Sequence, residues 1–287
     1  MEKIENKTIV IISPDSWSFI PVSKHHYAIE LAKHNKVYFI NPPNQDADFV
    51  DKGVTVINQY KKLRGIHFFP KVIQRLLMRL EVNSIISKVF NKKIDIVWSF
   101  DTSRLYYLDL FKSNVKIAHI MDYTEHFYFK ELVGSADFCL SVADCISEKM
   151  TPYSKKIYKI NHGFYSSSNK YYNQNNGLKS GVYIGNLSMD FIDWKLIALL
   201  ANENPTITFK FFGPNNINKT NLNPNFVKVK SLTNIEILNQ ISPDEVIDEL
   251  KKNDFCFQFT DVLLNFDNTR SIISHASIQK STFFKPN

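Results

Sequence analysis

Short apolar runs alternate with amphipathic stretches over most of the chain, from about residue 8 to about residue 259. The runs are rich in Val, Ile and Phe and end at Pro, Gly, Asn or Asp, a pattern typical of strands. In the first half the predicted strands are Thr8–Ile12, Lys36–Ile40, Val54–Ile57, Asp95–Phe100, Val115–Ile120 and Asp137–Val142. Near-continuous apolar strands separated by helices predict a parallel sheet that is covered on both faces.

Two helices of this first half are predicted from their spacing. One extends to about His34, with Tyr27 and Leu31 on the same apolar face. The other begins at Pro70, a favourable first-turn residue, and extends to about Phe90. Each of them connects two predicted strands, as a crossover in a parallel sheet does.

The second half repeats this alternation of strands and helices. Its predicted strands are Gly181–Ile184, Ile207–Phe212, Val227–Val229, Ile235–Leu238 and Asp254–Phe259. Helices are predicted over 190–202 and from Ser242 to Lys252, where Ser242 and Glu245 have the spacing of a capping box.

A polar stretch separates the two halves. Residues Ser166–Lys179 are rich in Ser, Asn and Tyr and have no periodicity, which predicts a linker. The chain of 287 residues is long enough for two domains. We therefore predict an α/β protein with two Rossmann-like, doubly wound domains, over 1–165 and 181–287, joined by a linker over 166–180.

The net charge of +7 is concentrated in one segment. Residues 52–93 contain ten Lys or Arg and one acid, a net +9, whereas the rest of the chain has 25 basic and 27 acidic residues. A protein that is basic over its whole surface is therefore excluded. One basic surface remains to be explained.

Cysteine usage and hydropathy favour a cytoplasmic protein. Cys139, Cys145 and Cys256 form no Cys-x-x-Cys pair and have no His at zinc spacing, so we interpret them as small apolar core residues and predict no metal site. The segment Met1–Thr8 lacks the apolar core of a signal peptide, and no run approaches the roughly 18 apolar residues of a membrane span.

Ligands of doubly wound sheets bind beyond the carboxyl ends of the strands. The loops expected there are Ser13–Ser23, Asp101–Arg104, Asp122–His126, Gly185–Asp190, Gly213–Asn216 and Thr260–Asp267. Neither G-x-G-x-x-G nor G-x-x-x-x-G-K-[ST] occurs, which argues against a dinucleotide dehydrogenase and a P-loop enzyme. A cleft between the two domains is the expected active site.

Two of these loops begin with glycine. Gly185 and Gly213 each follow a predicted strand. A glycine at this position lets the backbone approach a phosphate closely and leaves helix N–H groups free to bind it. Simple strand-end turns have the same sequence pattern, so both interpretations stay open.

The loop after the strand that ends at Ile120 is polar. Asp122, Glu125 and His126 are suited to acid–base chemistry or to binding sugar hydroxyls, and they are equally compatible with a solvated loop. His119 lies inside the strand among apolar neighbours, and we interpret it as a core or cleft-edge histidine.

Aromatic and imidazole side chains gather in two other loops. Trp17 precedes His25 and His26, and an exposed Trp at such a position stacks on a sugar or base, whereas a buried one only packs. His162 and Gly163 lie just before the linker, where the mouth of the expected cleft would be.

Several of these segments resemble, in their order and spacing, the GT-B-fold glycosyltransferases related to bacterial group-1 (glycogen-synthase-like) enzymes of polysaccharide synthesis. The resemblance covers about residues 8 to 265. It rests on Lys24–Ala28 (KHHYA), Val37–Pro43 (VYFINPP), Met121–Tyr123 (MDY), Asn161–Phe164 (NHGF), GVYIGNLSMDFIDWKLIALL from Gly181, FKFFGP from Phe209, and SPDEVIDELKKNDFCFQF from Ser242.

The resemblance implies transfer of a sugar from a UDP- or GDP-linked nucleotide sugar to a saccharide or lipid-linked acceptor, in cell-surface polysaccharide synthesis. It implies Asp122 as the catalytic residue, on an acceptor side formed by the first domain, and no metal or cofactor beyond the donor substrate. The implied acceptor-binding residues are Trp17, His25, His26, Glu125 and His126. The implied donor-binding residues are His162, Gly163, Gly185, Asn186 and Gly213.

The sequence departs from this family in its second domain. Asn186 stands where many retaining members have Arg or Lys, no Glu-x7-Glu segment occurs, and 28 residues follow Phe259. We therefore expect a donor domain that is incomplete at its C-terminal end. Two explanations are a truncated or frameshifted chain and a shorter variant with a different donor site.

The basic segment contains an amphipathic helix. Lys71, Arg75 and Arg79 form one stripe at a spacing of four, and the apolar Val72, Leu76 and Leu80 form the stripe beside it. An anionic membrane surface attracts such a basic stripe, which predicts a peripheral contact at the inner face of the cell membrane. A solvated basic face is the alternative. No nucleic-acid-binding motif accompanies the charge, so a nucleic-acid partner is not expected.

Three functions follow from these observations. The first is a glycosyltransferase of the hexosyltransferase kind. The second is a catalytically impaired, truncated homologue that acts as a binding or partner subunit, and the third is a sugar-nucleotide epimerase of the same fold.

Overall fold

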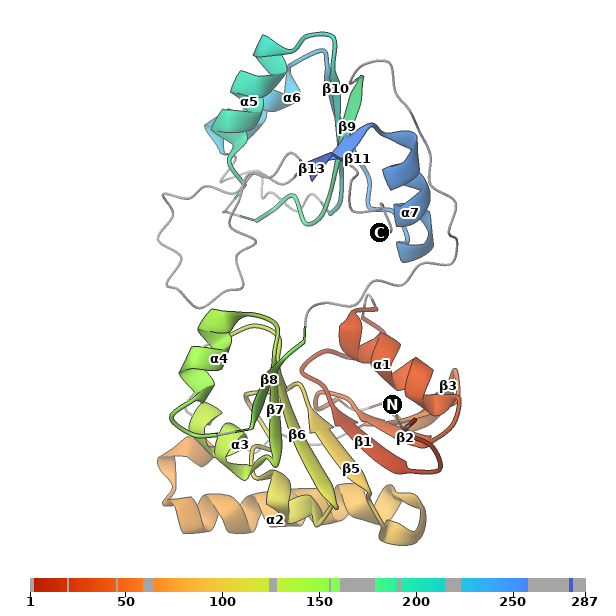
Figure 1. Cartoon of the computed structure of the whole chain (residues 1–287), viewed down its shortest axis with the longest axis vertical. Coiled ribbons are helices and arrows are strands. Elements are labelled where there is room, and N and C mark those ends of the chain that lie inside the picture. The colour runs from red at the N-terminus through yellow and green to blue at the C-terminus, as the bar shows by residue number, and fades with distance from the viewer. Residues whose placement is uncertain are drawn as a thin grey trace. The chain divides into compact units, whose positions relative to one another are not determined.

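The computed structural model describes residues 3–19, 21–44, 46–58, 65–123, 128–154, 156–160, 179–189, 192–214, 223–257 and 279–280. These residues form two compact units, one made of those up to 160 and the other of those from 179 (Figure 1). Each unit has its own sheet and its own hydrophobic core.

The sheet of the first unit has eight strands in the order β3–β4–β2–β1–β5–β6–β7–β8. They are β1 (Thr8–Ile12), β2 (Lys36–Ile40), β3 (Phe49–Asp51), β4 (Val54–Ile57), β5 (Ile96–Ser99), β6 (Val115–Ile120), β7 (Phe138–Ser141) and β8 (Ile157–Lys159). Neighbours are parallel except β3, which pairs antiparallel with β4 at the edge. The chain moves outward from β1 to β2 and β4 and then returns to the other side of β1 at β5, so a topological switch point lies between β1 and β5.

Helices cover both faces of this sheet (Figure 1). One face packs against α1 (Ser23–Ala32) through a cluster that includes Ile9, Ile11 and Phe39. The other packs against α2, α3, α4 and a 3₁₀ turn, through a larger cluster. Their bounds are α2 (Lys71–Lys88), α3 (Phe129–Ser135), α4 (Asp144–Met150) and η3 (Leu108–Phe111), with η1 (Ile66–Phe68) and η2 (Phe90–Lys92) flanking α2.

Helix α2 buries a different face from the apolar stripe described in the sequence. Gln74, Met78, Val82 and Ile85 are its buried residues, whereas the apolar stripe singled out in the sequence, formed by Val72, Leu76 and Leu80, is exposed. A polar residue is tolerated inside because the Gln74 amide donates to the Phe69 carbonyl at 2.7 Å and accepts from the Tyr106 hydroxyl at 2.9 Å.

The sheet of the second unit has the order β11–β10–β9–β12–β13. Its strands are β9 (Ser180–Ile184), β10 (Thr208–Phe212), β11 (Ile235–Leu238), β12 (Phe255–Cys256) and the antiparallel edge strand β13 (Gln279–Lys280). Helices α5 (Trp194–Glu203) and α6 (Pro224–Lys230) cover one face, and α7 (Pro243–Lys252) lies on the other (Figure 1). The switch point of this sheet lies between β9 and β12.

The strand predicted over Val227–Val229 is wrong, because these residues lie in α6. The Asn223 side chain accepts from the Asn225 N–H, Pro224 occupies the first turn, and Phe226 and Val229 bury the same face of the helix. Three alternating residues are too few to separate a strand from a helix with this spacing.

The predicted α/β class with two Rossmann-like sheets is confirmed. Three strands are additional to those predicted: β3 and β8, at the edges of the first sheet, and β13, at the edge of the second. Most of the predicted linker lies outside the described residues, and the domain bounds and the incomplete second domain stay predictions. Cys139, Cys145 and Cys256 are free thiols, and Cys139 is buried.

Candidate functional site

A buried ion pair organises the carboxyl edge of the first sheet at its switch point. Asp101 follows β5 and is paired with Arg104, whose Nε donates to the Asp101 carboxylate at 2.6 Å. The Arg104 guanidinium also donates to the carbonyls of Ser13 and Ile40, at 2.7 and 3.3 Å. One side chain therefore ties together the ends of β1, β2 and β5. Both partners are buried, so this pair is structural, and the sequence indicated the loop without indicating this role.

His25 orders the loop that follows β1. Its Nδ1 accepts the Val22 N–H at 3.2 Å, and its Nε2 lies 3.1 Å from the Ser16 carbonyl, to which it donates in the corresponding tautomer. The ring stacks on Phe39 at 5.2 Å between centroids. Burial lowers the pKa of His25, so the ring is neutral near pH 7. The acceptor-binding role predicted for His25 stays a prediction, and its contacts in the structure are structural.

Trp17 lies in the same loop and packs against the protein. Its indole Nε1 donates to Asp51 of β3 at 2.9 Å, its backbone N–H donates to the Asn41 side chain at 2.8 Å, and its ring meets Phe39 edge-on. The side chain is half-buried, so one part of it faces solvent. His26, on the next helix, is exposed.

Asp122 is exposed directly beyond the end of β6. Because β1, β5 and β6 are neighbours and parallel, the loops that contain Trp17, Asp101 and Asp122 leave the same edge of the sheet. The other two predicted residues of this loop, Glu125 and His126, lie outside the described residues.

His119 is buried inside the sheet, as its sequence context predicted. Its ring lies among Tyr27, Trp98 and Phe100, with centroid distances of 6.1, 5.9 and 4.8 Å.

In the second unit, two glycine turns meet at the carboxyl edge of the sheet. Gly185 follows β9 and Gly213 follows β10, and a Cβ built on Gly213 would lie 1.7 Å from the Gly185 carbonyl oxygen. The Gly185 N–H donates to the Phe212 carbonyl at 2.9 Å, and the Leu187 N–H donates to the Pro214 carbonyl at 3.1 Å. The two turns therefore pack backbone against backbone, which requires glycine at Gly213.

Asn186 lies at the tip of the first of these turns. The residue is exposed, and its side-chain oxygen accepts the Ser188 N–H at 2.9 Å, which closes a local turn. At the start of α5 the Asp193 carboxylate accepts from the Leu196 N–H at 2.9 Å, and its negative charge there opposes the binding of an anion. Of the backbone N–H groups of the loop, those of Gly185, Leu187 and Ser188 already donate within the protein. His162 and Gly163, predicted to contribute here, lie outside the described residues.

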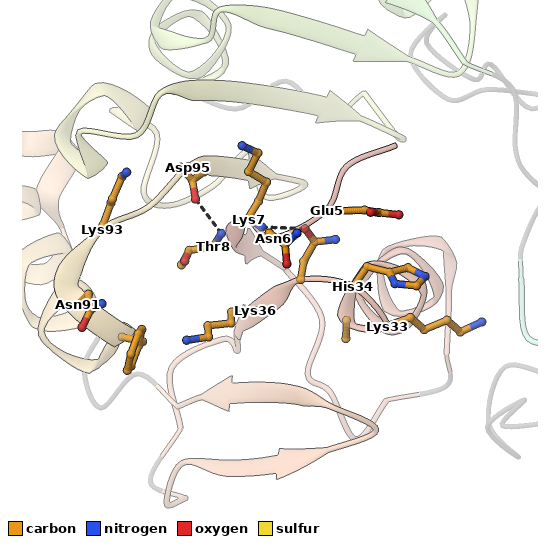
Figure 2. Close-up of a pocket in the computed structure, with 13 residues that line it drawn as sticks. Glu5, Asn6, Lys7, Thr8, Lys33, His34, Lys36, Asn91, Lys93 and Asp95 are labelled. Carbon is orange, nitrogen blue, oxygen red and sulfur yellow. Dashed lines mark hydrogen bonds between the residues drawn. The ribbon is translucent and has the colours of Figure 1, made fainter. Parts of the chain in front are cut away.

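A hollow of about 770 Å³ lies at the opposite, amino-terminal edge of the first sheet (Figure 2). Asp95 accepts from the Thr8 N–H at 2.9 Å there, and Lys7, Lys36 and Lys93 line it. It includes none of the predicted site residues, and doubly wound sheets bind ligands at the other edge.

Neither a metal site nor a membrane span occurs in the described part of the chain. No group of three or more His, Cys, Asp or Glu there could hold a metal ion. None of the helices described has the length and apolar composition needed to cross a bilayer.

No protein-family profile and no curated protein matches the sequence. Solved structures match the fold. The apo form of the lipopolysaccharide outer core galactosyltransferase WaaB aligns over 88% of this chain and 74% of its own, with a TM-score of 0.59 and 11% identity. Anabaena HepE in complex with UDP and glucose aligns over 89% of this chain and 74% of its own, with a TM-score of 0.55 and 11% identity.

The chain has the GT-B fold. A UDP-GlcNAc 2-epimerase from Neisseria meningitidis bound to UDP-GlcNAc also aligns, over 87% of this chain and 76% of its own, with a TM-score of 0.50 and 11% identity. At these identities the comparisons establish the fold, and the activity of this GT-B chain has to be argued from its own residues.

The predicted residues of the GT-B chain fall on the carboxyl edges of its two sheets. Trp17, His25 and Asp122 belong to the first unit, and Gly185, Asn186 and Gly213 to the second. Within the first unit, Trp17 and His25 contact each other at 5.5 Å between centroids. Within the second, Gly185 and Gly213 are in backbone contact.

Two of the three basic residues in the predicted membrane stripe of α2 form ion pairs with acidic side chains. Lys71 pairs with Glu131 at 2.8 Å, and this hydrogen bond raises the pKa of Lys71. Arg75 pairs with Asp109 and lies over the Tyr107 ring at 5.1 Å. Arg79 is exposed.

Proposed function

We propose that this GT-B chain is a glycosyltransferase that moves a sugar from a UDP- or GDP-linked donor to a saccharide or lipid-linked acceptor in cell-surface polysaccharide synthesis. The main supporting observation is the close packing of the Gly185 and Gly213 turns at the carboxyl edge of the second sheet. This edge presents backbone without side-chain bulk, as a binding site for a diphosphate needs.

The donor side of the proposal uses this glycine edge. The Asn186 N–H, which lies between loop N–H groups that are already bonded within the protein, would donate to the diphosphate, because the first turn of α5 is capped by Asp193. Asn186 is exposed at the tip of the loop and would contact the donor with its amide. The protein then stabilises the leaving diphosphate by position and by hydrogen bonding, and no metal or other cofactor is required in this scheme.

The acceptor side of the proposal uses the first unit. Asp122 is an exposed carboxylate beyond β6, suited to accept a hydrogen bond from an acceptor hydroxyl and to take up its proton. Trp17 and His25 shape the neighbouring loop after β1, which the Arg104 pair fixes to the sheet. His26, Glu125 and His126 complete the acceptor-binding set proposed from the sequence.

Nucleotide titration tests the donor site. We expect isothermal titration calorimetry to detect binding of UDP or GDP, or of their sugars, to the whole chain. Asn186→Asp places a carboxylate beside the diphosphate while keeping the acceptor of the Ser188 N–H. Repulsion of roughly 1 kcal/mol or more between this carboxylate and the diphosphate would weaken nucleotide binding at least about fivefold.

The matched control is Asn202→Asp, which makes the same change on the exposed surface near the end of α5, toward the opposite edge of the same sheet. It should leave nucleotide binding unchanged. If no nucleotide binds at millimolar concentration, the enzyme proposal is overturned and the impaired partner subunit is favoured.

An epimerase is the second candidate, because the Neisseria epimerase shares the fold at a TM-score of 0.50. Product analysis separates the two reactions. A transferase leaves the donor sugar intact until a saccharide or lipid-linked acceptor is added, whereas an epimerase converts a UDP-sugar with no acceptor present.

A further inference from the structure

The outer face of α2 and the turn before it form an exposed apolar ridge. The ridge comprises Phe68, Phe69, Val72, Ile73, Leu76 and Leu80. Phe68 is 83% exposed, Val72 80%, Leu76 56% and Leu80 62%. Exposed apolar side chains are ordinary when isolated, but six within thirteen residues on one side of the fold mark an interaction surface.

This ridge lies on the side of α2 that faces away from its own core. The buried residues Gln74, Met78 and Val82 point toward the sheet, and at about 100° per residue the ridge falls on the opposite side of the helix. Toward the C-terminal end, the same side continues as the exposed polar residues Asn83, Ser84 and Ser87. The ridge is therefore confined to the first half of α2 and the preceding turn.

The turn that presents the two phenylalanines is anchored to the core. The Gln74 amide donates to the Phe69 carbonyl at 2.7 Å and accepts from the buried Tyr106 hydroxyl at 2.9 Å. Gly65 starts the turn with a positive φ of 75°, and its carbonyl accepts the Phe68 N–H at 3.0 Å. The Phe68 backbone is thus fixed at the surface by a hydrogen bond, and its side chain is largely exposed.

Charge indicates what covers this surface. Lys71, Arg75 and Arg79 lie along one flank of the ridge, and the segment 52–93 has a net charge of +9. Docking of two copies through this face would bring the basic flanks of both ridges close together, which opposes such a dimer. A bilayer with anionic headgroups complements the flank and accepts the apolar side chains at the depth of its interface.

We propose that the ridge inserts into the interface of an anionic lipid bilayer, with Phe68 and Leu76 among its inserting side chains. Lys71 and Arg75 already have acidic partners, so insertion of the ridge, rather than the basic stripe alone, is the main source of binding. The surface lies on a helix outside the proposed donor and acceptor edges, so this inference does not depend on the proposed function.

Vesicle co-sedimentation tests the inference with the whole chain. The vesicles are phosphatidylcholine with about 30% phosphatidylglycerol, an anionic surface. The ridge variant combines Phe68→Gln, Val72→Gln, Leu76→Gln and Leu80→Gln. These substitutions leave the net charge unchanged, and Gln has a high helix propensity. The matched control makes the same change at four exposed apolar residues elsewhere, Phe90, Tyr158, Leu199 and Val227. We expect the ridge variant to bind vesicles at least about tenfold more weakly than the wild type, and the control to bind as the wild type does.

A fluorescence measurement keeps the test independent of folding. Phe68→Trp should show a blue-shifted emission when these vesicles are added, and Leu199→Trp should not. Equal vesicle binding by the wild type and the ridge variant, or no binding by the wild type, overturns the inference. A dimer seen by analytical ultracentrifugation and abolished in the ridge variant would show that a second copy covers the ridge, which also overturns it. Nucleotide titration without lipid tests the proposed function separately.

Discussion

At the scale of single residues, His25 has the contacts of a structural group. Its two ring nitrogens meet the Val22 N–H and the Ser16 carbonyl, and its ring is 2% exposed. A proton on Nδ1 would remove the acceptor of the Val22 N–H and would place a charge among Trp17 and Phe39. Both effects favour the neutral ring in the folded protein.

This lowered pKa predicts a pH dependence of stability. Because the unfolded value is near 6.5 and the folded value is lower, the unfolded chain binds the proton first as the pH falls. The stability contributed by the neutral ring is complete above about pH 6.5 and is lost as the pH falls toward the folded pKa. In urea denaturation, the difference in free energy of unfolding between the wild type and His25→Asn should shrink from about pH 7.5 to about pH 5.

The exposed Asn83, which does not titrate, supplies the control for this measurement. The difference between the wild type and Asn83→Ser should stay constant over the same range. A constant difference for His25→Asn as well would contradict the prediction.

Gly213 gives a second prediction at this scale. A methyl group on Gly213 would collide with the Gly185 carbonyl, so Gly213→Ala should lower the free energy of unfolding by about 1–3 kcal/mol as one turn is pushed from the other. Gly134→Ala is the control, because a Cβ there meets nothing within 4 Å and lies in α3, where Ala is favoured by roughly 0.5–1 kcal/mol. The urea midpoint should therefore fall for Gly213→Ala and rise for Gly134→Ala. The same midpoint for both variants would disprove the close approach of the two glycine turns.

At the scale of elements, the ends of three strands depend on one side chain. Arg104 joins β1, β2 and β5 by donating to the Ser13 and Ile40 carbonyls while it neutralises Asp101. The carboxyl edge of the first sheet is thus held by a polar layer rather than by apolar packing. The loop after β1, which contains Trp17, starts from this layer.

Arg104→Met should lower the free energy of unfolding by about 3–5 kcal/mol, because it leaves the buried Asp101 carboxylate without its cation. Arg104→Lys should recover only part of this loss, since an ammonium cannot reproduce the fork of the guanidinium. Arg79→Met, on the exposed side of α2, should stay within about 0.5 kcal/mol of the wild type. Thermal and urea unfolding measure all three variants, and an Arg104→Met protein as stable as the wild type would refute the structural role.

Most elements were predictable because their periodicity was long enough to be distinctive. The strands β1, β2, β4 and β6 are apolar over nearly their whole length, as buried parallel strands are. Two features were not predictable. Helix α6 has the local pattern of a short strand, and α2 turns inward a face that includes Gln74, because its amide finds partners that only folding brings near.

At the scale of the whole molecule, each unit has a sheet and a hydrophobic core of its own. The first unit buries two clusters, one on each face of its sheet, and the second unit buries an aromatic cluster around Trp194 and Phe211. Lys71, Arg75 and Arg79 of the basic segment belong to the first unit and form the flank of the apolar ridge. Donor chemistry and surface attachment are therefore proposed on different units, so their tests are independent.

The sequence by itself determined the fold class, most of the order of strands and helices, and the loops at the carboxyl ends of the strands, since these follow from local periodicity and turn residues. Only the tertiary structure decided which side of α2 is buried, which contacts hold His25 and Arg104 in place, and that Gly185 and Gly213 meet. These properties depend on contacts between residues far apart in the chain, and local pattern has no information about such neighbours. The exposure of the ridge could not be predicted for the same reason. The sequence pattern of an apolar stripe is the same whether the stripe faces a sheet or a lipid surface.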